Sequence, residues 1–300
     1  MIIPDLSYKV YSSIVFGQIG DALGIPYEAI PPVKDVLVPE HFQLSDDSQL
    51  TLATYKSIVE VNGLDPANCA KLFLTEFELG NITGMGAATL SALLSLQAGS
   101  HWFTSGVSGE MSAGNGCAMR ISPLIHFCDP FNPFDRKIIR DFTKITHNND
   151  EAYAGALAIL MIMKCLNSKM SVDSSYKLIC ESLFDSKVRD SIQSVFESPV
   201  DDFVQHCHRL KNSGYIVHTI EIVFRALFHS QSNCKYQTML DVIKVGGDTD
   251  INASIYGNII GHVYGHSDVP QQVLDKVPRR TDLYKISKKI EEIIKSNLDR

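Results

Sequence analysis

The 300-residue sequence predicts an all-α fold, and two observations carry this prediction. Apolar residues recur at helical spacings of three and four along nearly the whole chain, and no stretch alternates apolar and polar residues as a half-buried strand does. In addition, segments 7–24 and 248–265 carry rows of small residues, mostly glycine, at spacings of three and four. Glycine costs about 1 kcal/mol per helical position relative to alanine. Each row therefore indicates a neighbouring backbone, or a ligand, close to that helix face.

Turn residues divide the chain into successive helices. Asn62-Gly63 ends one helix, and Asp65-Pro66 supplies the cap and the first-turn proline of the next. No linker, charge block or internal repeat separates parts of the chain, which predicts one compact multi-helix domain over residues 1–300. We expect helices at about 7–24, 48–61, 66–80, 86–98, 135–147, 150–167, 172–184, 188–196, 201–211, 218–230, 235–245, 248–265 and 281–297.

Composition excludes several classes of protein. With 45% hydrophobic and 20% charged residues, the chain is globular and not disordered. Its longest apolar run, 156–163, is far shorter than the roughly 20 residues of a membrane span. Since residues 1–7 show no basic stretch followed by an apolar one, we expect no secretory signal. A net charge of −7 argues against nucleic-acid binding. Seven scattered cysteines without a Cys-x-x-Cys pair predict buried thiols in a reducing compartment. We therefore expect a cytoplasmic protein that binds neither nucleic acid nor membrane.

Two acidic doublets precede predicted helices, at 45–48 (Ser-Asp-Asp-Ser) and 246–250 (Gly-Gly-Asp-Thr-Asp). Each alone is explained by a helix cap or a glycine turn. If the two helix ends met, four carboxylates would share one pocket, and such a group needs a compensating cation. Oxygen ligands favour Mg²⁺ or Mn²⁺, and four aspartates suffice for two divalent ions. The hydroxyls of Ser45 and Thr249 could add further ligands.

Three other segments are candidate ligand contacts. Residues 112–120 contain Gly114-Asn115-Gly116, whose backbone we expect to tolerate positive φ and to offer N–H groups to an anion, a plain turn being the alternative. Gly84 and Gly86 form a weaker candidate of the same kind. His147 lies between two predicted helices, where a lone histidine is usually a helix cap or a surface residue.

Taken in order, these motifs are specific. They are 17–28 (GQIGDALGIPYE), 45–49 (SDDSQ), 114–120 (GNGCAMR), 146–147 (TH) and 245–250 (VGGDTD). This set resembles the ADP-ribosylglycohydrolase family over about residues 8–270. The resemblance implies an all-α fold with a cleft that holds two divalent cations, Mg²⁺ or Mn²⁺. It also implies removal of ADP-ribose from modified arginine or serine side chains.

The resemblance further implies residue roles. Glu28 matches a glutamate that lies near the scissile bond in relatives, and we take Glu28 and Asp47 as the catalytic candidates. The implied metal ligands are Ser45, Asp46, Asp47, Asp248 and Asp250. The candidates for substrate binding are Ser112, Gly114, Asn115, Gly116 and His147, together with Gly84 and Gly86. One position departs from the pattern: Ile251 stands where the family has a threonine or serine that helps to coordinate a metal, which weakens the case for one of the two ions.

The expected function is that of a metal-dependent hydrolase. It cleaves the glycosidic bond at the distal ribose of an ADP-ribosylated protein and releases ADP-ribose, through an oxocarbenium-like transition state that needs an activated water and an assisted leaving group. Two alternatives stay open. One is a catalytically impaired relative that binds ADP-ribose or has a structural role, which Ile251 supports. The other is an unrelated Mg²⁺-dependent phosphoesterase that uses the same carboxylates.

Overall fold

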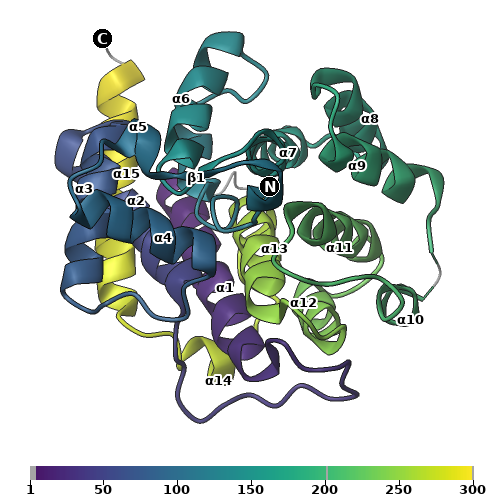
Figure 1. Ribbon diagram of the computed structural model, residues 1–300. Coiled ribbons are helices and arrows are strands. Elements are labelled where there is room, and N and C mark those ends of the chain that lie inside the picture. Colours follow the sequence, from purple (N-terminus) through teal and green to yellow (C-terminus); the bar gives the residue numbers. More distant parts are fainter. Residues whose placement is uncertain (1–4, 201, 299–300) are drawn as a thin grey trace.

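The computed structural model describes residues 5–200 and 202–298 and confirms the all-α prediction (Figure 1). Fifteen α-helices and three short 3-10 helices make up most of the described chain. The α-helices are α1 (Leu6–Gly24), α2 (Asp46–Val61), α3 (Pro66–Glu78), α4 (Ala87–Gln97), α5 (Trp102–Ser105), α6 (Pro133–Lys144), α7 (Asp150–Asn167), α8 (Val172–Ser182), α9 (Lys187–Glu197), α10 (Phe203–Cys207), α11 (Ile216–His229), α12 (Lys235–Lys244), α13 (Thr249–Tyr264), α14 (Gln271–Leu274) and α15 (Arg280–Leu298). The 3-10 helices are η1 (Ile25–Tyr27), η2 (Glu110–Ser112) and η3 (Ser122–His126).

Two local expectations are wrong. The helix expected at 135–147 ends at Lys144, and the chain continues into a two-residue strand, β2 (His147–Asn148), which pairs in parallel with β1 (Val107–Ser108). Strands of two residues are too short to show an alternating pattern, so sequence periodicity cannot reveal them. The helix expected at 201–211 is reduced to α10, and residues 212–214 form a loop. The assignment of residues 1–300 to one domain stays a prediction.

The antiparallel pair of α1 and α13 runs through the centre of the molecule (Figure 1). The small-residue rows form their contact: a Cβ on Gly20 would overlap the carbonyl oxygen of Ala253, and one on Gly24 would overlap the backbone of Asp250. A Cβ on Gly257 would likewise overlap the backbone of α1. The close backbone approach expected from glycine spacing is therefore confirmed. It places the C-terminal end of α1 beside the N-terminal end of α13.

The apolar run at 156–163 lies within α7, whose side chains are buried on nearly all sides among α6, α8, α11 and α13. Across residues 5–200 and 202–298, no helix combines the length and the apolar character that crossing a membrane requires. Five of the seven cysteine thiols are buried as expected, and none forms a disulfide. Cys180 is half-buried, and Cys234 is exposed because it caps the surface helix α12.

Two histidine rings pack against each other, one half-buried at position 126 and one buried at position 262. The rings of His126 in η3 and His262 in α13 are 5.2 Å apart, and the ring of Tyr55 lies 6.3 Å from His126. Burial lowers the pKa of His126 to about 3, and the charge of Lys9 adds to this effect. Burial also lowers the pKa of His262 well below its usual value. Both side chains are therefore neutral in the folded protein at neutral pH.

We expect these histidines to make the protein acid-labile. Between pH 7 and pH 5 the unfolded chain binds protons at a histidine of pKa near 6.5, whereas the folded chain does not, so stability falls as pH falls. His126→Phe keeps an aromatic ring but removes the proton site. Between pH 7 and pH 5 the free energy of unfolding of this variant should fall by about 2 kcal/mol less than that of the wild type. Urea unfolding at the two pH values measures both. His41→Phe, at an exposed histidine, controls for the loss of a histidine as such. Equal losses in the wild type and His126→Phe would contradict the expectation.

Candidate active site

A cleft of about 520 Å³ opens where the N-terminal ends of α2 and α13 meet the segments 28–29, 84–89, 111–116 and 212–214. This volume lies within the range of about 300–1,000 Å³ that small-molecule sites occupy. Most of the residues singled out from the sequence line it together, although they are distant in the chain. They are Glu28, Asp46, Asp47, Gly84, Gly86, Ser112, Gly114, Asn115, Gly116, His147, Asp248 and Asp250. Ser45 is buried next to the cleft and does not line it.

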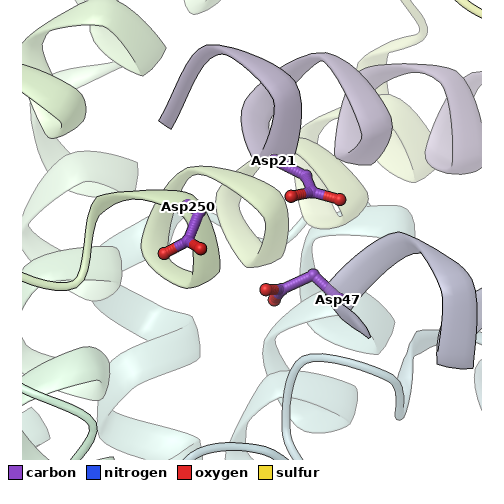
Figure 2. A group of neighbouring side chains, drawn as sticks. All are labelled: Asp21, Asp47 and Asp250. Atoms are coloured by element: carbon purple, nitrogen blue, oxygen red, sulfur yellow. The ribbon is translucent and has the colours of Figure 1, made fainter. Parts of the chain in front are cut away.

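Three buried aspartates converge at the inner end of the cleft (Figure 2). Carboxylate oxygens of Asp21 in α1, Asp47 in α2 and Asp250 in α13 all lie within 4.8 Å of one another. Asp47 and Asp250 were predicted from the sequence, whereas Asp21 was not. The sequence does contain a signal for Asp21, because it is the one acidic residue within the glycine-rich apolar segment 7–24, and buried carboxylates are rare without a partner.

Asp21 holds the beginning of α2 in place. Its carboxylate accepts hydrogen bonds from the Ser45 backbone N–H at 3.1 Å, the Ser45 hydroxyl at 2.8 Å and the Ser48 backbone N–H at 3.3 Å. These donors include N–H groups that the first turn of a helix leaves without intrahelical partners. Asp21 therefore caps α2 from a neighbouring helix, and both of its oxygens are engaged.

The carboxylate of Asp47 is less completely bonded. Its Oδ2 lies 3.0 Å from the Ser45 hydroxyl oxygen, while its Oδ1 is buried without any hydrogen-bond partner. A buried carboxylate oxygen without a partner is costly and calls for a proton or a cation. Ser45 can give its proton to Asp21, and its oxygen accepts the Asp47 backbone N–H at 3.3 Å, which leaves one lone pair of that oxygen for a cation. The donor set at this position therefore fits a hard metal ion.

The aspartates raise one another's pKa. Burial, followed by the charges of Asp250 and Asp21, raises the pKa of Asp47 well above its usual value. Burial, followed by the charge of Asp248, raises the pKa of Asp250 to about 8. The pKa of Asp46 rises for the same reasons, burial first and then neighbouring carboxylates. Such a group is compatible with full ionisation only when a cation is bound.

Asp248 is oriented by an amide and not by its own helix. Its Oδ2 accepts a 2.7 Å hydrogen bond from Asn115 Nδ2, which also donates to Thr219 Oγ1 at 2.8 Å. Although Asp248 precedes α13, its side chain makes no capping hydrogen bond, so the simple helix-cap interpretation is wrong at this position. The carboxylate faces the cleft because Asn115 holds it there.

The hydroxyl of Thr249 is engaged in packing between helices. This side chain is fully buried and donates a 2.9 Å hydrogen bond to the carbonyl of Gly24, which ties α13 to the end of α1. Its hydroxyl proton is used in packing, and the residue does not line the cleft. Ile251 does line it and is half-buried beside Asp250, whose Oδ1 accepts the Ile251 backbone N–H at 2.9 Å.

The glycines of the 112–116 loop make room for His147. Neither Gly114 nor Gly116 has a positive φ, so that expectation is wrong. Instead, a Cβ on Gly114 would lie 2.7 Å from His147 Nε2, and a Cβ on Gly116 would lie 2.9 Å from His147 Cε1. The backbone N–H of Asn115 donates to Gly214 at 3.0 Å and is not free for an anion. His147 itself is buried and not a surface residue.

Gly84 and Gly86 differ from each other. Gly84 has a φ of 77°, which favours glycine, and lies against Ser45 and Asp46. Gly86 is the N-terminal capping residue of α4 and has an ordinary φ of −63°. Both border the cleft on the side of α2.

Sequence reasoning missed the loop at 212–214, which closes one side of the cleft. Its sequence, Asn-Ser-Gly, is a turn signal that marks a loop but does not indicate that the loop borders a ligand site. The Gly246-Gly247 turn, in which both glycines have a positive φ, lies directly against this loop, and Asn212 Nδ2 donates a hydrogen bond to the Gly246 carbonyl. There the Ala29 N–H donates to the Gly247 carbonyl at 2.8 Å, which places the exposed Glu28 at the mouth of the cleft.

Comparison with known proteins identifies the family. The sequence pattern of the ADP-ribosylglycohydrolase family matches residues 4–299. The chain belongs to the ADP-ribosylglycohydrolase family. This ADP-ribosylglycohydrolase is accordingly an enzyme that hydrolyses glycosyl bonds.

Individual relatives of the ADP-ribosylglycohydrolase are distant in sequence. It is 23% identical to ADP-ribosylarginine hydrolase Tri1 of Serratia proteamaculans, over 94% of this chain and 78% of that protein. It is 24% identical to the ADP-ribosyl-dinitrogen reductase glycohydrolase of Rhodospirillum rubrum, over 80% of this chain and 75% of that protein. A solved structure described as an ADP-ribosylglycohydrolase-related protein complex matches with a TM-score of 0.78 at 19% identity, covering 97% of this chain and 99% of that chain. This likeness confirms the fold.

Proposed function

We propose that the enzyme removes ADP-ribose from a modified protein side chain by hydrolysing the glycosidic bond at the distal ribose. The observation that carries the proposal is the convergence of buried aspartates from α2 and α13 on one cleft, where Asp47 Oδ1 has no partner. The names of the relatives support the substrate class, since they denote enzymes that act on ADP-ribosylarginine and on ADP-ribosylated dinitrogen reductase.

The residues at the inner end of the cleft fit two divalent cations, Mg²⁺ or Mn²⁺. When bound, such ions lower the pKa of a coordinated water and orient the ribose hydroxyls. Asp21 and Asn115 position the ligand side chains through the hydrogen bonds described above. The proposed ligands are Ser45, Asp46, Asp47, Asp248 and Asp250.

The remaining residues of the cleft handle the substrate. Glu28, at the exposed mouth, lies where a carboxylate can transfer a proton to or from the leaving group. His147 and the Ser112–Gly116 segment border the space in which the pyrophosphate or the ribose would lie, and Gly84 and Gly86 border it on the α2 side.

The test is incubation of the enzyme with arginine- and serine-ADP-ribosylated peptides, with Mg²⁺, with Mn²⁺ and with EDTA. We expect intact ADP-ribose as the product, by mass spectrometry, in at least one metal arm and none with EDTA. Release of AMP in place of ADP-ribose would favour the phosphoesterase alternative. Absence of any product, together with calorimetric binding of ADP-ribose, would favour the impaired relative.

Metal binding should stabilise the fold. Adding Mg²⁺ or Mn²⁺ to metal-free enzyme at about 100 times its dissociation constant should contribute about 2.7 kcal/mol, which raises the melting temperature by about 5 °C. The physical reason is that the cation relieves repulsion among Asp47, Asp250 and their neighbours. NaCl of equal ionic strength controls for general salt effects. An unchanged melting temperature at millimolar metal would contradict a preformed site.

Ile251→Thr should lower the metal concentration that gives half-maximal activity. Ile251 lines the cleft beside Asp250, so a threonine hydroxyl there can replace a water ligand of the cation. Ile251→Val is the matched control, because valine has the shape of threonine but no oxygen. The measurement is a metal titration of hydrolysis and of binding. Superimposable curves for the threonine and valine variants would show that position 251 does not reach the metal.

A further inference from the structure

A buried chain of three side chains leads from the core to the cleft. Arg120 is fully buried, and its Nη2 donates hydrogen bonds to Thr146 Oγ1 at 2.6 Å and to the carbonyl of Phe142 at 3.2 Å. Thr146 Oγ1 in turn lies 2.9 Å from His147 Nδ1. Thr146 is fully buried and His147 nearly so, whereas Arg120 does not line the cleft.

Packing alone does not explain why an arginine is buried at position 120. Among the described residues it forms no ion pair with a carboxylate, and its Nε and Nη1 have no hydrogen-bond partner. The thiols of Cys69 and Cys117 nearby are neutral, because burial raises the pKa of each to about 12. Besides its two hydrogen bonds, the guanidinium group has a cation–π contact with the ring of Phe73, 4.8 Å from the guanidinium carbon. Burying an incompletely bonded charge is costly. Arg120 therefore lowers the stability of the fold, which indicates a role other than packing.

The direction of each hydrogen bond follows from donor chemistry. A guanidinium has no acceptor, so Arg120 must donate to the Thr146 oxygen. The one proton of the Thr146 hydroxyl then needs an acceptor, and His147 Nδ1 is the other partner that the structure gives this oxygen. Burial lowers the pKa of His147 to about 3, and the charge of Arg120 adds to the shift, so the ring is neutral. A neutral ring that accepts at Nδ1 carries its proton on Nε2.

The opposite edge of the ring meets the cleft. His147 Nε2 lies beside Gly114, where any Cβ would be only 2.7 Å away, and His147 lines the cleft. We propose that Arg120, acting through Thr146, holds His147 as the Nε2–H tautomer, so that the histidine donates a hydrogen bond to an oxygen of the bound ligand. Arg120 and Thr146 are positioning residues. The ligand is an oxygen-rich anion of the ADP-ribose class, and only this part rests on the proposed function.

The tautomer is measured on the substrate-free enzyme. Histidine is labelled with ¹⁵N, the His147 signals are assigned by their loss in His147→Gln, and a long-range ¹H–¹⁵N correlation identifies the protonated nitrogen. We expect Nε2–H in the wild type. Thr146→Val, which keeps the shape but removes the hydroxyl, should give a mixture or the Nδ1–H form, and Thr146→Ser should restore Nε2–H. A wild-type ring protonated at Nδ1, or the same tautomer in the valine variant, would overturn the proposal.

Ligand binding tests the donor role separately. With ADP-ribose as the probe, Thr146→Val should raise the dissociation constant about tenfold. The dissociation constant of Thr146→Ser should stay within about twofold of the wild-type value. Equal affinities in the valine variant and the wild type, despite a changed tautomer, would overturn the donor role. Failure of the wild type itself to bind ADP-ribose would count against the proposed function, while the tautomer measurement would still decide the role of Arg120.

Discussion

Asp47→Asn should lower kcat/KM for ADP-ribose release by about 1,000-fold. Metal ions contribute several kcal/mol of transition-state stabilisation, and about 4 kcal/mol corresponds to this factor. Asp47 lies in the acidic cluster of Figure 2, and its buried Oδ1 is the carboxylate oxygen without a partner. An asparagine at this position offers one weaker oxygen and an amide that repels a cation. The measurement is the rate of ADP-ribose release at saturating Mg²⁺ or Mn²⁺.

The same variant separates function from stability. Because burial and neighbouring carboxylates raise the pKa of Asp47, its neutral replacement should leave the metal-free melting temperature at or above that of the wild type. Asp173→Asn is the matched control, since Asp173 occupies the first turn of α8 as Asp47 does in α2 but is exposed. It should change neither activity nor stability. Full activity of Asp47→Asn would rule out Asp47 as a metal ligand.

Gly20→Ala should destabilise the protein by about 3 kcal/mol, at the upper end of the usual cost of overpacking. Alanine is the better helix former by about 1 kcal/mol, so propensity alone predicts the opposite sign. The added Cβ would overlap the carbonyl oxygen of Ala253, and backbone cannot move aside as a flexible side chain can. Since this contact joins α1 to α13, metal affinity should fall together with stability.

The measurement is the free energy of unfolding of Gly20→Ala by chemical denaturation, with Gly63→Ala as the control variant. Gly63 follows α2, has no positive φ and would meet nothing within 4 Å of an added Cβ. Its replacement should leave stability unchanged or raise it by a few tenths of a kcal/mol, because alanine restricts the unfolded chain. If Gly20→Ala were as stable as the wild type, α1 and α13 could move apart without loss of folding stability, and the expectation would be wrong.

The fold class and most helices follow from local sequence. Periodicity and capping residues place α1, α2, α7 and α13 within about two residues of their observed ends. Local signals suffice for these helices because the residues that make an apolar face are near neighbours in the chain. The two-residue strands and the shortened α10 depend on contacts with distant segments, which periodicity does not report.

The sequence by itself determined which residues could take part in the site: the two acidic doublets, Glu28, His147 and the Asn115 loop all border one cleft. It did not determine what each side chain bonds to. Asp21 acquires its role where α1 meets α2, Thr249 where α13 meets α1, and Gly116 where its loop meets His147. The physical reason is that a carboxylate, a hydroxyl or a missing Cβ has many possible partners, and only tertiary packing selects among them.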